Sequence, residues 1–61
     1  MEMMIRLDID SMKGHQVAET FEKLAHEFRT AADDPQVGDS GRVYDPEDNP
    51  IGVWTIWNLP N

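Results

Sequence analysis

Two histidines are the residues of this sequence best suited to acid–base or metal chemistry. His15 and His26 stand eleven positions apart in a segment with helical periodicity. On a helix this spacing is three turns, about 16 Å, which is too far for both to bind one metal ion. His26 falls opposite the apolar stripe of the segment, so we expect it to face solvent. His15 has the chemistry of a general base, but the sequence places no nucleophile or acid with it, and we predict no catalytic residue.

An acidic turn supplies the second set of candidate ligands. Its oxygen-bearing residues are Asp45, Glu47, Asp48 and Asn49. A calcium loop of the EF-hand type needs glycine at its sixth position and glutamate at its twelfth. Counted from Asp45, those positions hold Pro50 and Ile56. We therefore predict a solvated turn, with no bound metal and no cofactor.

A short run before the last third of the chain has the letters of a catalytic motif. Gly38-Asp39-Ser40-Gly41 resembles the residues around the nucleophile of trypsin-like serine proteases. That chemistry requires a histidine base and an orienting acid held by a far larger fold. Glycine, aspartate and serine also favour turns. The run predicts a loop that leads into a strand, and we do not expect an enzyme.

Length and charge narrow the class of protein further. The chain has 61 residues, no cysteine, and a formal charge of −7 from twelve acids and five bases. We predict one small domain over 1–61, which buries only about 60% of its unfolded surface and gains from oligomerisation or a partner. The charge argues against direct binding to nucleic acid or an anionic membrane. The N-terminal segment mixes acids with apolar residues, unlike a signal peptide or membrane span, so we expect a cytoplasmic protein.

Three elements are predicted to position these side chains. Alternation of apolar and polar residues indicates a strand over about 2–10, and a three- and four-residue period indicates a helix over about 14–32, capped by Ser11 or Gly14 and ended before Pro35. The last third predicts a β-hairpin over about 41–57. The fold class is α+β: a β-α-β-β two-layer sandwich of one helix on a three-stranded sheet. Strand order stays open, and we favour the antiparallel arrangement with the third strand in the centre.

The hairpin sequence allows a register to be predicted. Pro46 suits the start of a four-residue loop built on a type I turn, and Asn49 tolerates a left-handed conformation. Tyr44 then faces Ile51, and Arg42 faces Val53. A slip of one residue in either strand would exchange the faces.

This register divides the apolar residues between two sides of the sheet. The predicted core comprises Met3, Ile5, Leu7, Ile9, Val17, Phe21, Leu24, Phe28, Val43, Trp54 and Ile56. The side away from the helix holds Met4, Arg6, Tyr44, Ile51, Val53 and Trp57. An exposed apolar patch of more than a few hundred Å² on a monomer usually marks an interaction site.

We therefore predict a non-enzymatic small acidic protein-interaction module that acts through its open sheet face, by self-association as a homo-oligomer or by binding another protein. The predicted interface residues are Tyr44, Ile51, Val53 and Trp57. Alternatively, the Trp57 side chain covers the edge of the core.

The acidic residues suggest an alternative function. Seven aspartates are spread along the chain: Asp8, Asp10, Asp33, Asp34, Asp39, Asp45 and Asp48. Gathered on one rim, they would imitate phosphates, as in phage- or mobile-element-type inhibitors that block a nucleic-acid-binding protein such as a defence nuclease. That comparison rests on size and charge alone. An acidic surface also serves solubility without any partner.

Overall fold

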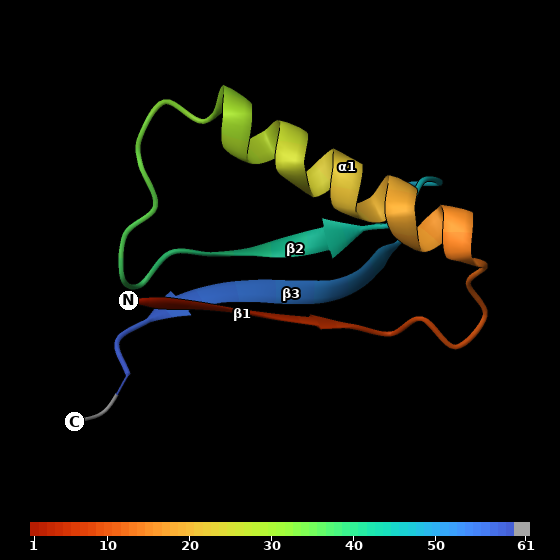
Figure 1. Ribbon diagram of the computed structural model, residues 1–61, viewed down its shortest axis with the longest axis horizontal. Helices are drawn as coiled ribbons and strands as arrows, with labels where there is room; N and C mark the ends of the chain where they lie inside the picture. The colour runs from red at the N-terminus through yellow and green to blue at the C-terminus, as the bar shows by residue number, and fades with distance from the viewer. Residues whose placement is uncertain (60–61) are drawn as a thin grey trace.

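Three antiparallel strands and one helix make up the described part of the chain. The computed structural model describes residues 1–59, so the last two residues of the predicted 1–61 domain lie outside it. The elements are β1 (Glu2–Leu7), α1 (Gly14–Thr30), β2 (Ser40–Tyr44) and β3 (Pro50–Trp57). β3 lies between the other strands, antiparallel to both. The predicted α+β class and the favoured strand order are confirmed. Figure 1 shows α1 running beside β2, with β1 farthest from the helix.

β1 is three residues shorter than the alternation predicts, because Asp8 turns the chain. The Asp8 N–H still donates to the Ile51 carbonyl at 2.8 Å, but the Asp8 carboxylate accepts from the Asp10 N–H at 3.2 Å. Such a bond from an aspartate to the backbone two residues on favours a turn over a strand. Ile9 therefore leaves the sheet and is 47% exposed, so its predicted place in the core is wrong.

α1 begins at Gly14 as predicted, but its capping residue and its C-terminal end differ from the prediction. The N-cap is Lys13, whose backbone N–H donates to the side-chain oxygen of Gln16 at 2.8 Å. This is half of a capping box, so neither Ser11 nor Gly14 has the predicted capping role. The helix ends at Thr30, because Ala31 is already extended with φ −65° and ψ 139°.

The hairpin turn is built around the Asp45 carboxylate. This group accepts the N–H of Glu47 at 2.9 Å and the N–H of Asn49 at 2.8 Å. The Asp48 N–H donates to the Asp45 carbonyl at 3.0 Å, which closes the four-residue turn around Pro46. The left-handed residue is Asp48, with φ 65°, and not Asn49 as predicted. Aspartate adopts this conformation at lower cost than most residues because its short side chain can bond locally.

The predicted hairpin register is right at its centre and wrong near the turn. Arg42 faces Val53 as predicted, but Tyr44 pairs with Pro50 and not with Ile51. The pairing shifts between Val43 and Tyr44, which leaves Ile51 as an extra residue opposite β2. A bulge of this kind bends the bulged strand and redirects its side chains.

The buried core is smaller than predicted and is centred on a threonine. Its members are Thr20, Leu24, Val43 and Ile56. Thr20 is 1% exposed, and its hydroxyl donates to the Gln16 carbonyl one turn back at 2.8 Å, so the buried polar group is satisfied. Phe21, predicted at the centre of the stripe, is 46% exposed. The contact face of α1 is therefore shifted toward Thr20 and away from Phe21, while Leu24 and Phe28 lie on it as predicted.

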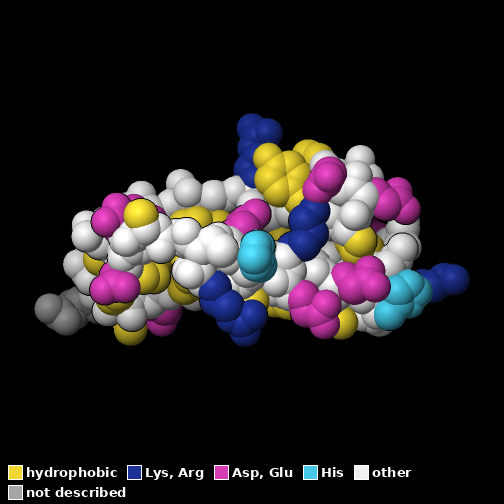
Figure 2. Space-filling view, turned by 90° about the horizontal axis from the view of Figure 1, so that it is seen from above, with side chains coloured by type: hydrophobic (Ala, Val, Ile, Leu, Met, Phe, Trp, Pro, Cys, Tyr) yellow, Lys and Arg dark blue, Asp and Glu magenta, His cyan; other side chains and the backbone are white. Residues whose placement is uncertain are grey.

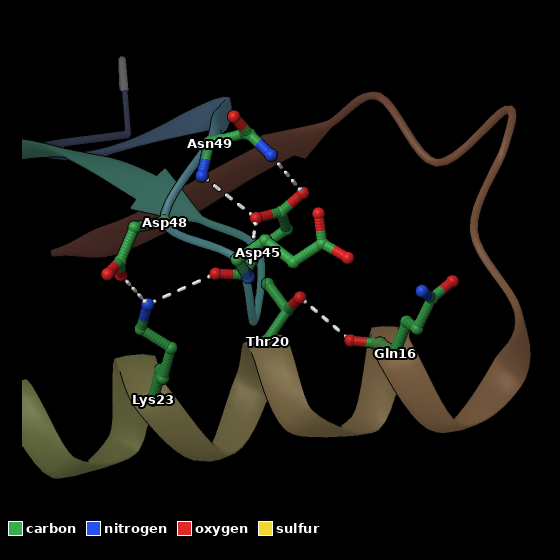
Figure 3. A network of polar contacts seen from close by, with 7 residues as sticks. Gln16, Thr20, Lys23, Asp45, Asp48 and Asn49 are labelled. Atoms are coloured by element: carbon green, nitrogen blue, oxygen red, sulfur yellow. Dashed lines mark hydrogen bonds and ion pairs between the residues drawn. The ribbon is translucent and has the colours of Figure 1, made fainter.

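Two contacts fix α1 over β2. Phe28 packs on Trp54 with ring centroids 4.9 Å apart, and the Trp54 indole lies over Gly41, where a Cβ would come within 2.5 Å of its nitrogen. At the other end, the Lys23 ammonium donates to the Asp45 carbonyl at 3.1 Å and pairs with the Asp48 carboxylate. Figure 3 shows Lys23 reaching from the helix to the turn. The helix therefore packs chiefly against β2.

The position of α1 over β2 leaves the helix-side residues of β1 partly uncovered. Met3 and Ile5 face that side as predicted, pairing with Ile56 and Trp54 of β3. They nevertheless remain 39% and 36% exposed, because α1 lies over the far strand. The sheet thus has one open face and, on its other side, one uncovered strand.

Candidate protein interface

The open face of the sheet carries an apolar strip. Its exposed members are Met4 from β1 and Val53 and Trp57 from β3, at 39%, 51% and 42% exposure. Alternation along β3 puts Val53 and Trp57 on the side away from Trp54, which contacts the helix. No element of residues 1–59 packs on this strip, since the single helix of the described chain lies on the other side.

Two arginines flank the strip in one row across the sheet. Val53 faces Arg6 of β1 on one side and Arg42 of β2 on the other. Both arginines are exposed. They are two of the five bases in a chain with a charge of −7, so the open face is locally basic on an acidic protein. Arginine binds carboxylates through a planar, bidentate fork, which makes this row suited to acidic groups.

Trp57 is held at the end of the strip by Glu2. Its indole N–H donates to the Glu2 carboxylate at 3.1 Å, and the two residues are cross-strand partners. The bond orients the indole along the open face. Trp57 is therefore exposed and held in place on the open face, while Trp54 is half-buried against Phe28 on the helix side of the sheet.

The other two predicted interface residues, Tyr44 and Ile51, are less exposed than Val53 and Trp57. Tyr44 is half-buried. It borders a small hollow beside Thr20 and Lys23 of the helix, while alternation along β2 puts its side chain on the same side of the sheet as Arg42. Ile51 is half-buried beside the bulge. It lines a hollow of about 310 Å³ with Arg6 and Val53, next to the strip. The candidate interface on the open face thus comprises Met4, Val53 and Trp57, with Ile51 beside them and Arg6 and Arg42 on either side.

The sequence placed Arg6 on the open face, but it could not reveal that Arg6 pairs with Val53. The facing of Arg42 and Val53 follows from the hairpin turn, which links adjacent strands. The facing of Arg6 and Val53 joins residues 47 positions apart and needs the order and offset of β1 against β3. A long-range pairing of this kind has no local sequence signal.

The aspartates divide between the two ends of the molecule instead of forming one rim. Asp8, Asp10, Asp45 and Glu47 surround a hollow of about 530 Å³ at the end of the hairpin turn. At the opposite end, a hollow of about 130 Å³ is lined by Asp33 and Asp39 together with Phe28 and Trp54. Figure 2, which looks down on the helix, shows acidic side chains toward both ends.

Asp45 has the one resolved shift in pKa among the described carboxylates. The backbone N–H of Asn49 lowers the pKa of the Asp45 carboxyl below its usual value, helped by the Asn49 amide, the Glu47 N–H and the Lys23 charge. Hydrogen bonds to the charged form favour that form. Asp45 is therefore a structural anion of the turn.

The residues with catalytic potential are not brought together. His15 lies in the first turn of α1 and His26 lies toward its C-terminal end, and both are exposed. Ser40 opens β2, and the neighbouring Asp39 carboxylate accepts the Gln36 N–H at 2.9 Å within a turn. Within residues 1–59, no three histidine, aspartate or glutamate side chains are grouped as a metal site would require.

Comparisons with known proteins leave the function to be argued from this geometry. The chain matches no protein-family model, no curated protein and no solved structure. Among the described residues, no helix has the length and apolar character needed to cross a membrane.

Proposed function

We propose that this protein is a non-enzymatic interaction module that docks another protein on the open face of its sheet. The observation that carries the proposal is the row in which exposed Val53 stands between Arg6 and Arg42. The partner surface would present an apolar side chain to Val53 and Trp57 and carboxylates to the two arginines. Interface cores are commonly built from aromatic residues and arginine in this way.

Charge supports a carboxylate-bearing partner over a basic one. Apart from Glu2, the acids of the described chain lie on the loops and the helix. A partner that approaches the open face therefore meets Arg6 and Arg42 first. Complementary charge at the rim would steer this approach and fix the register of binding.

Site-specific photocrosslinking at Val53 tests the proposal. A photoreactive residue at Val53 should capture a partner in the source cell, and the same residue at Ala18, on the exposed side of α1, should not. The purified partner is then titrated with wild-type protein, with Arg6→Glu/Arg42→Glu, and with Lys13→Glu/Arg29→Glu. We expect the first pair to weaken binding by about tenfold or more, and the control pair to change it little.

The control pair makes the outcome decisive. Both double variants change the net charge by the same amount, but Lys13 and Arg29 lie at the ends of the helix. Equal loss in both variants would mean that overall charge, and not the open face, governs binding. If the only product at Val53 is a second copy of this chain, the occupant of the face is the protein itself.

A second candidate function follows from the acidic hollow at the hairpin end. There, four carboxylates gather from two loops, which suits capture of a basic protein surface that otherwise binds nucleic acid. A labelled arginine-rich peptide serves as the probe. Salt-sensitive binding that is lost in Asp10→Lys/Glu47→Lys but kept in Asp33→Lys/Asp34→Lys would favour charge mimicry at this end. Equal loss in both variants would remove it.

A further inference from the structure

The outer edge of β1 presents backbone groups that no described residue bonds. The Asp8 N–H donates to the Ile51 carbonyl, in line with the β1–β3 register. Hydrogen-bonded and non-hydrogen-bonded pairs alternate in an antiparallel ladder. The even-numbered residues of β1 therefore bond to β3, and the N–H and C=O groups of Met3, Ile5 and Leu7 point outward. In Figure 1, no described element lies beyond this edge.

β1 also has few of the features that usually protect an edge strand. Its six residues include no proline and no lysine, and its register against β3 is unbroken. Charged residues, prolines and bulges are the common ways to stop an edge from accepting a further strand. The charges of β1 are confined to Glu2 and Arg6, one near each end.

We propose that β1 pairs antiparallel with β1 of a second copy, about a two-fold axis at Met4. In this register Glu2 faces the partner's Arg6, and Arg6 faces the partner's Glu2. Both ion pairs lie on the open face, because Glu2, Met4 and Arg6 alternate with the helix-side residues. On the helix side, Met3 faces the partner's Ile5, so each uncovered apolar residue gains an apolar neighbour. Opposite charges and apolar pairs directly across strands both stabilise pairing.

Neighbouring registers are less favourable. A two-fold axis at Ile5 would set Glu2 against the partner's Asp8, with like charges opposite one another. An axis at Met3 would shorten the overlap and leave Arg6 beyond the partner's strand. Registers between these would place helix-side residues against open-face residues. The axis at Met4 is therefore the register that satisfies both charge and apolar pairing.

The assembly closes at two copies because β2 does not offer the same edge. Centred on its own middle residue, β2 would set Arg42 against the partner's Arg42. A two-fold interface that uses β1 alone gives a dimer, whereas pairing at both edges would give a fibre. The dimer has a six-stranded sheet, and its two open faces become one continuous surface. This inference rests on the backbone edge of β1; it shares Met4 and Arg6 with the docking strip but does not depend on the proposed partner.

Charge exchange across the axis tests the pairing. Sedimentation equilibrium should show that the wild-type chain forms a dimer. Glu2→Arg and Arg6→Glu should each raise the dimer dissociation constant by about tenfold or more, because each converts two attractive pairs into like-charge pairs. The double variant Glu2→Arg/Arg6→Glu restores opposite charges and should recover dimerisation. Circular dichroism checks that each variant is folded. A monomeric wild-type chain, or a double variant no better than the singles, would overturn the proposal.

Disulfide formation gives a second test that does not depend on charge. The chain has no cysteine, so Met4→Cys introduces one thiol per copy. In the proposed register the two Met4 residues form a non-hydrogen-bonded pair with Cα atoms about 4.5 Å apart, within the range that a disulfide spans. Met4→Cys should therefore crosslink rapidly, and Val53→Cys, on the same face one strand away, should not. Equal rates, or faster crosslinking through Val53, would place the contact on the open face and contradict the edge pairing.

Discussion

The outer strands β1 and β2 pair with the same central strand but differ in what covers them. β2 has α1 packed over it, and its Val43 is 2% exposed. β1 has the more apolar sequence, yet Ile5 at its centre is 36% exposed. The difference comes from where the helix is fastened, since Lys23 and Phe28 both tie α1 to the hairpin. Burial in this small sheet is therefore decided by helix position more than by strand composition.

The largest expected effect compares one truncation on each side of the sheet. Leu24→Ala removes a buried side chain over β2 and should cost about 2–5 kcal/mol, enough to unfold much of a marginally stable domain. Ile5→Ala removes a partly exposed side chain of β1 and should cost about 1 kcal/mol or less in the monomer. Urea unfolding at low protein concentration measures both. Equal losses would mean that β1 is covered after all.

A methyl group at Gly52 tests the junction of β1 with the central strand. A Cβ there would lie 2.0 Å from the Arg6 carbonyl oxygen and 2.8 Å from the Leu7 side chain. Backbone cannot swing aside as a side chain can, so Gly52→Ala should cost about 1–3 kcal/mol or more and loosen β1 first. Hydrogen exchange at β1 amides reports that loosening. Gly14→Ala, where nothing lies within 4 Å, is the matched control and should be neutral or stabilising.

The tie between the helix and the hairpin should have a smaller effect. Lys23→Met keeps the apolar stem and removes the charge that bonds Asp45 and Asp48. The Lys23 and Asp48 side chains are 37% and 83% exposed, so solvent screens the pair and we expect a loss below about 1 kcal/mol. Lys13→Met is the control, because it removes one positive charge at the start of α1, outside this contact. A loss of several kcal/mol specific to Lys23 would show that this contact, and not apolar packing, holds α1 over β2.

The smallest expected effect is a pH dependence at the turn beside β2. The pKa of Asp45 is lowered in the folded state by the Asn49 N–H, so its contribution to stability is present above the usual carboxyl range and is lost as pH falls through the lowered value. Asp45→Asn should be less stable than wild type at pH 7, and the gap should narrow at strongly acidic pH. Thermal unfolding at several pH values measures the gap, with Asp34→Asn as the charge control. A gap independent of pH would contradict this role.

Element types were predictable from local patterns, and element contacts were not. Alternation around Met3 and Ile5 and the helical period around Leu24 are local signals, so the strands, the helix and their order in the chain follow from the sequence. The face of Val53 and Trp57 followed from the hairpin turn. The cross-strand partner of Tyr44 was predicted wrongly, because the bulge at Ile51 shifts the pairing by one residue next to the turn.

By itself the sequence determined an acidic α+β domain with a hairpin that is apolar on both sides, because side-chain periodicity and turn chemistry act over a few residues. Only the tertiary structure decided that α1 covers β2 and leaves β1 bare, that Thr20 and not Phe21 faces the core, and that Arg6 joins Arg42 beside Val53. These outcomes depend on contacts between residues distant in the chain. Their energies come from packing and pairing across the fold, which no local pattern encodes.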